Sequence, residues 1–306
     1  MAVTSPPIRT KPKFDFTPYL FLIGPLTLYL VWIIAPMFYS FYLSTTDWDG
    51  ISPDAKYIGL SNFETLFGSM GKRRTSPFEY ALVNNLKWLL TFITIPVAMG
   101  LGLAIVLNQN VKGDRFFKMG IFLPQVLSLP VIGLIWAWVY NPRDGFINPL
   151  LTSLGLADPP SWLSDKELVI WAVIFAAAWR QIGYIMILYV AGLKNVDIRL
   201  LEAAKLDGAN AWQSFRHITF PLLAPVTTIV VVISVIDSLR SFDLVWVMTK
   251  GGPANASTVL AVLMYIQAFN NYKMGLGAAT AVVLFMISLV FIVGYLWRIM
   301  KDEMEY

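Results

Sequence analysis

The stretch EAAKLDGANAWQSFRHITFPLLAP, from Glu202 to Pro225, is a polar, helix-forming segment set between two long apolar runs. Its start is rich in Ala, Leu, Glu and Lys, which are strong helix formers. Gly208 then supplies a permissive backbone at which a helix can end or turn. A short, charged helix of this kind suits a groove in another protein. We therefore interpret the segment as a docking loop between membrane spans; the simpler alternative is an ordinary interhelical loop with a helical turn.

The composition around this segment is that of a membrane protein with several spans. Of the 306 residues, 57% are hydrophobic and 14% are charged, and the mean hydropathy is +0.63. A helix needs about 20 apolar residues to cross roughly 30 Å of hydrocarbon. Such runs lie at 16–46, 88–111, 120–142 and 274–297, and two further runs that contain charges lie at 168–193 and 218–247. None has the alternation of a lipid-facing strand. We predict an all-α, polytopic membrane protein with six transmembrane helices.

Basic residues mark the expected orientation, because Lys and Arg are enriched on the cytoplasmic side of membrane proteins. They gather at the amino terminus, in alternate loops and in the tail: Arg9, Lys11, Lys13, Lys112, Arg115, Lys118, Lys194, Arg199, Lys205, Arg216, Arg298 and Lys301. Lys72, Arg73 and Arg74, in the first external loop, run against this rule. We expect both termini and the Glu202 loop to be cytoplasmic. No solvated basic face indicates nucleic-acid binding.

Several kinds of site chemistry have no residues to support them in this sequence. There is no GxxxxGK[ST] phosphate-binding motif, so we expect no ATP hydrolysis by this chain. Cysteine is absent, which excludes disulfides, thiolate metal ligands and Cys nucleophiles. The single histidine, His217, lies in the docking loop, where a hydrogen-bonded loop histidine is the simplest interpretation. We predict neither a catalytic residue nor a metal site.

Four charged residues within the apolar runs need an explanation: Arg180, Asp237, Arg240 and Asp243. Charges inside a membrane are costly and usually face a cavity or a partner. Arg180 lies mid-run beside Gln181, with Tyr184 one helical turn along. In the fifth run, side chains that can bond to sugar hydroxyls recur at helical spacing on roughly one face: Ser234, Asp237, Ser238 and Ser241. Alternatively, Arg180 pairs with Asp237 or Asp243 and only ties two helices together. Among the tryptophans, which are enriched at membrane interfaces, we select Trp179 as a site candidate.

Several motifs resemble one transporter family. The spacing of Glu202-Ala203-Ala204, Gly208, Ile218 and Pro221 is similar to the EAA loop of ABC-importer permeases, whose coupling helix binds the ATPase subunit. YIGLSNF at 57–63 resembles a segment outside the first span of sugar-type permeases, and FDLVWVMTKGGP at 242–253 resembles the larger permease of maltose and glycerol-3-phosphate importers. The resemblance implies an ABC type I importer permease fold. It also implies ATPase coupling through Glu202, Ala203, Ala204, Asp207 and Gly208, and a substrate path containing Trp179, Arg180, Gln181 and Tyr184.

The resemblance further implies partners and a location. They are a second permease subunit, two ATP-binding subunits that hold the ATP and Mg, and an extracytoplasmic substrate-binding protein, in a prokaryotic cytoplasmic membrane. Nothing indicates a cofactor in this chain itself. The chain lacks the additional amino-terminal spans and the large external insertion of the well-known maltose member, so contacts made by those parts are not transferred.

We expect residues 1–18 to be a cytoplasmic lead-in and 19–80 the first transmembrane helix and external loop. Residues 81–300 are expected to form the permease core, with five transmembrane helices and the coupling loop at 198–221, and 301–306 a cytoplasmic tail. A secondary transporter driven by ions is the alternative function, but such transporters are built from internal repeats, and none is evident here. The substrate stays open among a di- or oligosaccharide, a glycosylated compatible solute and glycerol-3-phosphate.

Overall fold

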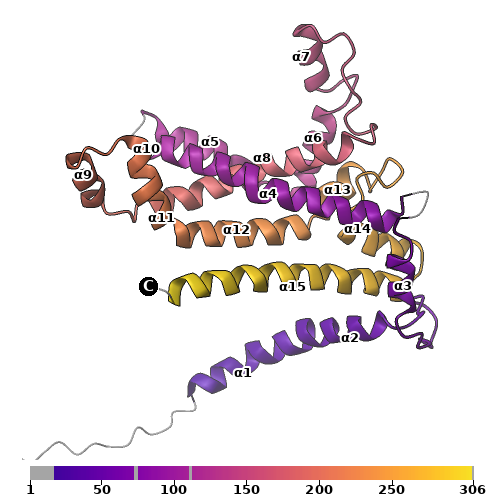
Figure 1. The fold of residues 1–306 in the computed structure, drawn as a ribbon. Helices are drawn as coiled ribbons and strands as arrows, with labels where there is room; N and C mark the ends of the chain where they lie inside the picture. The colour runs from indigo at the N-terminus through magenta and orange to yellow at the C-terminus, as the bar shows by residue number, and fades with distance from the viewer. Residues whose placement is uncertain (1–16, 72–74, 110–111, 305–306) are drawn as a thin grey trace, which may run out of the picture.

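The computed structural model describes residues 17–71, 75–109 and 112–304. In this part of the chain every regular element is helical, apart from one isolated bridge between Thr46 and Tyr57. Figure 1 shows the long helices running side by side as a bundle. Four helices are long and apolar enough to cross a membrane, and two bent pairs bring the number of spans to six. The predicted all-α fold with six spans is confirmed.

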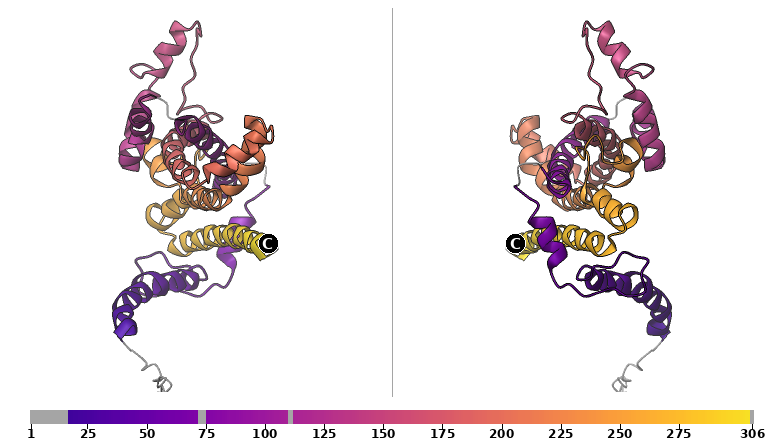
Figure 2. Two further views of the ribbon diagram at one scale, coloured as in Figure 1. Left: turned by 90° about the vertical axis from the view of Figure 1, so that its left-hand side faces the viewer. Right: turned by 90° about the vertical axis from the view of Figure 1, so that its right-hand side faces the viewer.

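The first span is apolar on every side. It comprises α1 (Thr17–Tyr29), a π-helical turn η1 (Leu30–Ile34) and α2 (Ala35–Leu43), and its side chains are almost all exposed. In Figure 2 this span lies at one extreme of the molecule, with the bundle beyond it. A helix that is hydrophobic all round is buried in protein or lies in lipid. The span therefore lies against lipid or another membrane protein along most of its length.

A short helix, α3 (Ser61–Phe67), follows the first span and is held by one buried side chain. Asn62 donates from Nδ2 to the carbonyl oxygens of Ser44 and Thr46, at 2.9 and 2.7 Å. Asn62 is the asparagine of the YIGLSNF motif. The motif thus has a structural role: it fixes the loop after the first span to the end of α2.

The centre of the bundle is the pair α4 (Pro77–Leu107) and α8 (Val169–Leu193). Small residues let their backbones approach closely, as is usual between membrane helices. A Cβ atom added to Gly100 of α4 would lie 2.6 Å from Ile185 Cγ2 of α8. Ser76 caps α4 by accepting a hydrogen bond from Glu79 N. Pro96 lies inside α4, and the helix continues through it.

The third predicted span, 120–142, is not one continuous helix. It consists of α5 (Asp114–Val126) and α6 (Leu129–Val139), which meet at an angle of 102°. Pro130 stands at the start of α6, a position that favours helix initiation. Pro124, inside α5, removes a backbone donor just before the break. The two prolines thus lie on either side of the break between α5 and α6. A hairpin bearing α7 (Ile147–Ser153) then projects from the bundle (Figures 1 and 2).

The fifth predicted span, 218–247, is also divided. The docking loop contains α9 (Ile198–Leu206), α10 (Ala211–Ser214), η2 (Phe215–Thr219) and α11 (Phe220–Leu222). The span continues as α12 (Ala224–Leu239) and α13 (Asp243–Met248), and the helices on either side of Leu223 differ in direction by 68°. Pro225 lies at the start of α12, again at a helix-initiating position. Residues 240–242 form a second, non-helical break between α12 and α13.

The last span closes the bundle next to the first. After α14 (Leu260–Tyr265) and η3 (Ile266–Asn270), the long helix α15 (Met274–Met304) lies between α12 and the first span (Figure 1). The start of α1 and the end of α15 point to the end of the bundle that carries α9 and α10. Most of the predicted lead-in, the end of the tail and the basic residues 72–74 lie outside the described residues.

Candidate functional site

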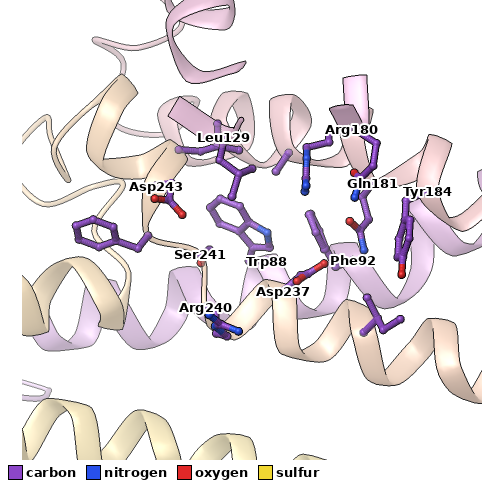
Figure 3. Close-up of a pocket in the computed structure, with 15 residues that line it drawn as sticks. Trp88, Phe92, Leu129, Arg180, Gln181, Tyr184, Asp237, Arg240, Ser241 and Asp243 are labelled. Atoms are coloured by element: carbon purple, nitrogen blue, oxygen red, sulfur yellow. The ribbon is translucent and has the colours of Figure 1, made fainter. Parts of the chain in front are cut away.

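A cavity of about 390 Å³ lies inside the bundle and collects side chains from several helices (Figure 3). Its walls come from α4, α5, α6, α8, α12, α13 and the break between the last two. The residues that line it are Trp88, Phe92, Gln125, Leu129, Ala177, Arg180, Gln181, Tyr184, Ile233, Asp237, Arg240, Ser241, Phe242, Asp243 and Leu244. We call this cavity the central pocket. A concave site with apolar walls and a few convergent polar groups is the usual form of a small-molecule site.

The central pocket brings together five of the predicted site residues. Arg180, Gln181 and Tyr184 of α8 face Asp237 of α12 and Ser241 across it. In Figure 3, Arg180 and Gln181 point from α8 toward Asp237, with the rings of Trp88 and Phe92 beside them. Two helices that are separated in the sequence therefore present their polar faces to one space.

Three predicted site residues do not line the pocket. Ser234 and Ser238 are fully buried, and Ser238 Oγ donates to Val235 O within its own helix. Ser238 O also accepts bonds from Asn85 Nδ2 and Ser241 Oγ. Trp179 points elsewhere and contacts Trp136 edge to face, with ring centroids 5.6 Å apart. Helical spacing placed these residues near the site but did not determine which side chains reach the cavity.

The four charges of the membrane runs all line the central pocket, yet they form no ion pair there. The ion pairs within the described residues join Lys118 to Asp114 and Arg199 to Asp197. No nitrogen of Arg180 lies within 4.0 Å of a carboxylate oxygen of Asp237 or Asp243. Arg180 therefore does not join two helices through an ion pair with either aspartate. The charged groups are turned toward the cavity.

Several buried polar atoms of the pocket residues also lack a hydrogen-bond partner. Among the described residues, the buried atoms without a hydrogen bond include Trp88 Nε1, Gln125 Oε1, Arg180 Nε and Gln181 Nε2. Leaving such atoms unpaired in an apolar interior is unfavourable by roughly 1–3 kcal/mol each. Their concentration around one cavity distinguishes it from an ordinary packing defect. The central pocket has the donors and acceptors needed to bind a polar solute.

The loop after α13 is held by a set of hydrogen bonds, and it supports one wall of the pocket. The hydroxyls of Thr249 and Ser257 lie 2.7 Å apart, and Thr258 Oγ1 donates to Gly251 O at 3.0 Å. From α4, Asn84 Nδ2 donates to the carbonyl oxygens of Ala256 and Thr258 at 2.8 and 2.9 Å. Within the MTKGGP segment, Thr249 and Gly251 take part in these bonds. They anchor α13, and with it Asp243 and Leu244 of the pocket.

The docking loop lies far from the pocket and is exposed. Asp197 caps α9 by accepting from Arg199 N, and Gly208 ends the helix with a left-handed φ of +83°. Glu202, Ala203, Asp207 and Gly208 are exposed, and Ala204 is half-buried. A capping box between Asn210 and Gln213 starts α10.

The same loop presents large apolar side chains to its surroundings. Leu206 is 90% exposed and Trp212 is 65% exposed. Figure 1 shows α9 and α10 projecting from the end of the bundle. His217 Nδ1 lies 3.0 Å from Gln213 O, as expected for a hydrogen-bonded loop histidine. Apolar groups displayed on a protruding, capped helix are typical of a protein interface.

Sequence comparison shows the family. A model described as the binding-protein-dependent transport system inner membrane component matches residues 94–305. The chain belongs to this family of ABC-importer permeases. The permease is 35% identical to a probable ABC transporter permease protein of Pyrococcus horikoshii, over 97% of this chain and 99% of that protein.

Relatives with named transport roles are nearly as similar. The diacetylchitobiose uptake system permease protein of Streptomyces coelicolor is 32% identical, over 93% of the permease and 83% of that protein. The trehalose/maltose transport system permease protein of Thermococcus litoralis is 30% identical, over 91% and 92%.

A solved structure shares the fold. A chain of the bacterial alginate ABC transporter, in complex with a pentasaccharide-bound periplasmic protein, superposes with a TM-score of 0.79. Its sequence identity is 22%, and the match covers 92% of the permease and 93% of that chain. The predicted type I importer permease fold is confirmed, and the permease is an inner-membrane component of an ABC importer.

Pocket residues on α4 and α5 were missed by sequence reasoning, chiefly Trp88, Phe92 and Gln125. Gln125 offered a signal, because it is a polar residue within an apolar run. Trp88 offered none, since tryptophan is frequent in membrane proteins for other reasons.

Proposed function

We propose that the permease forms the translocation path for a sugar or sugar-like solute and that ATP hydrolysis in partner subunits drives the transport. The residues that line the central pocket suit a polar solute. Relatives that match nearly the whole chain are named as permeases of saccharide transport systems. Sugars combine apolar ring faces with hydroxyls, and the pocket combines aromatic side chains with charged and amide groups.

The observation that carries ATP coupling is the exposed helix α9. It contains Glu202 through Leu206 and projects from the bundle, and Asp207 and the left-handed Gly208 follow its end. We propose that Glu202, Ala203, Ala204, Asp207 and Gly208 bind a groove of an ATP-binding subunit, which holds the ATP and Mg. The permease itself then needs no catalytic residue, cofactor or metal.

The proposed assembly contains a second permease, two ATP-binding subunits and an extracytoplasmic substrate-binding protein. The first span supports a further membrane partner, since its apolar surface is uncovered along most of its length. In the proposed orientation the docking loop and both termini face the cytoplasm of a prokaryote. Nothing in the described residues or in the family favours ion-coupled secondary transport.

A charge reversal tests the coupling proposal. We expect Glu202→Lys to lower ATP-driven uptake at least tenfold in liposomes containing the permease and its co-expressed neighbours, because the reversed charge opposes the groove contact. Glu64→Lys is the matched control, since Glu64 is also exposed and lies on α3 at the other end of the bundle. The measurement is uptake together with the ATPase rate, and size-exclusion chromatography checks assembly.

Two outcomes would contradict the proposal. If Glu202→Lys and Glu64→Lys give equal uptake, α9 does not make the coupling contact. If uptake persists in liposomes that lack the ATP-binding subunits, the permease is a secondary transporter and is not driven by ATP.

A further inference from the structure

Trp88 and Gln125 reach the central pocket from α4 and α5, two helices without any predicted site residue. Trp88 is 2% exposed, and its ring packs against Phe92 with centroids 5.9 Å apart. Its ring belongs to the hydrophobic core cluster that also contains Ile132 and Leu244. The indole is thus held in place by packing on its apolar faces.

One side-chain polar atom of each of these two residues has no hydrogen-bond partner among the described residues. Trp88 Nε1 and Gln125 Oε1 are buried, without a hydrogen bond to any described residue. An indole N–H can only donate, and the Gln125 carbonyl oxygen can only accept. In Figure 3 the Trp88 ring lies beside the space shared by Arg180 and Asp237. The two residues therefore offer one donor and one acceptor to a solute, and Gln181 Nε2 offers a further donor.

The charges of the central pocket balance. Its lining contains two arginines, Arg180 and Arg240, and two aspartates, Asp237 and Asp243. A phosphate or carboxylate in this space would be attracted by both guanidinium groups and repelled by both carboxylates. Burying an ion is costly unless it gains a net opposite charge. A hydroxyl avoids this conflict, because it donates to a carboxylate and accepts from a guanidinium.

We propose that Trp88 and Gln125 determine substrate specificity and that the central pocket takes an uncharged, polyhydroxylated solute. This inference rests on the proposed transport function and narrows it, since it excludes glycerol-3-phosphate and acidic sugars. The apolar ring face of the solute lies against the packed rings of Trp88 and Phe92. Its hydroxyls accept from Trp88 Nε1 and donate to Gln125 Oε1.

Ligand binding to the purified importer, without its binding protein, tests the solute class separately from transport. The probes are maltose, glycerol 3-phosphate and glycine betaine, which are uncharged, anionic and zwitterionic. Saturation-transfer-difference NMR gives a Kd for each. We expect maltose to bind at least tenfold more tightly than either charged probe. Tighter binding of glycerol 3-phosphate or glycine betaine, or no binding of maltose, would overturn the assignment.

Two variants test the two residues. Trp88→Phe keeps a packed aromatic ring and removes the N–H, and Gln125→Met keeps the length of the side chain and removes the acceptor. The controls are Trp138→Phe and Gln109→Met, since both residues are exposed and lie outside the pocket. We expect each pocket variant to raise the Kd for maltose roughly tenfold, as for the loss of one buried hydrogen bond. The controls should match the wild type.

The outcomes separate this inference from the proposed function. If the pocket variants bind maltose as tightly as the controls do, Trp88 and Gln125 are not specificity residues, even where ATP-driven uptake is intact. If the wild type binds maltose but drives no ATP-dependent uptake, the assignment of the solute stands and the coupling proposal fails.

Discussion

The docking loop and the central pocket are built in opposite ways. In the docking loop, the capping bonds connect neighbours in the sequence, such as Asp197 with Arg199 and Asn210 with Gln213. The pocket is formed by residues from Trp88 to Leu244, which meet only when α4, α8 and α12 pack together. One region depends on local sequence and the other on how closely the helices approach.

This contrast indicates where the permease tolerates change. The docking loop is exposed, and the constraint at Gly208 is local: a Cβ atom would meet nothing within 4 Å, but the left-handed φ of +83° disfavours any other residue. Near the pocket, Gly133 and Gly183 of the bundle lie directly against side chains or backbone of a neighbouring helix. Substitutions in the loop should therefore alter coupling, whereas substitutions in the bundle should alter folding. Thermal unfolding midpoints of variants can test this distinction.

The largest effect is expected from Gly183→Val. Gly183 lies on α8 next to the pocket residues, and a Cβ atom there would overlap the backbone of α5 at Ile121 O and Phe122 Cα. Valine would force α5 away from α8, at a cost of about 3 kcal/mol for overpacking. We expect a large fall in the thermal unfolding midpoint of the purified protein, measured by fluorescence-detected size exclusion.

The matched control is Gly102→Ala, since a Cβ atom on this helical glycine of α4 meets nothing within 4 Å. Its midpoint should stay near that of the wild type or rise slightly, because alanine favours a helix more than glycine does. An unchanged midpoint for Gly183→Val would show that the two helices can separate there without loss, and the contrast with the loop would fail.

A smaller effect is expected from Asn84→Leu. The side chain is buried, and its amide holds two carbonyl oxygens of the loop after α13. Leucine of similar size leaves Ala256 O and Thr258 O without these donors, at a cost of about 2 kcal/mol. The unfolding midpoint should fall by several degrees. Thr94→Val removes only local bonds, to Leu90 O and Thr91 O within the same helix, and should be neutral. If the unfolding midpoint falls equally in both variants, the bonds from Asn84 to the distant residues Ala256 and Thr258 contribute no more than a local bond within one helix.

Local features of the fold were predictable because their causes lie close together in the sequence. The apolar runs gave the spans, and helix formers followed by Gly208 gave α9 and its end. Arg180 and Asp237 were identified as pocket candidates because charge inside a membrane needs a cavity or a partner, and Gln181 because it lies beside Arg180 and by the family resemblance. The pocket contains all three.

The features that were missed depend on tertiary packing. Hydropathy treats 120–142 and 218–247 as continuous, whereas prolines and packing divide them into helices of different direction. Trp88 and Gln125 enter the pocket through the approach of α4 and α5 to α8, which no residue pattern in one helix encodes. Conversely, Ser234 and Ser238 share the expected helix face but point into packed protein.

The smallest effect concerns pH at the docking loop. The pKa of Asp197 is held below its ordinary value, first because its carboxylate accepts from the Arg199 side chain and second because it accepts from Arg199 N. A lowered folded-state pKa means that the cap stabilises α9 fully above the unfolded pKa of about 3.9. That stabilisation is lost as the pH falls through the folded-state pKa. Selective ¹⁵N-arginine labelling should show the Arg199 amide shift titrating with a midpoint below 3.9. In Asp197→Asn, which keeps a good N-cap without a charge, this titration should vanish. A midpoint at or above 3.9 in the wild type would mean that the carboxylate gains nothing from α9, and the local capping that defines this region would have to be assigned to other groups.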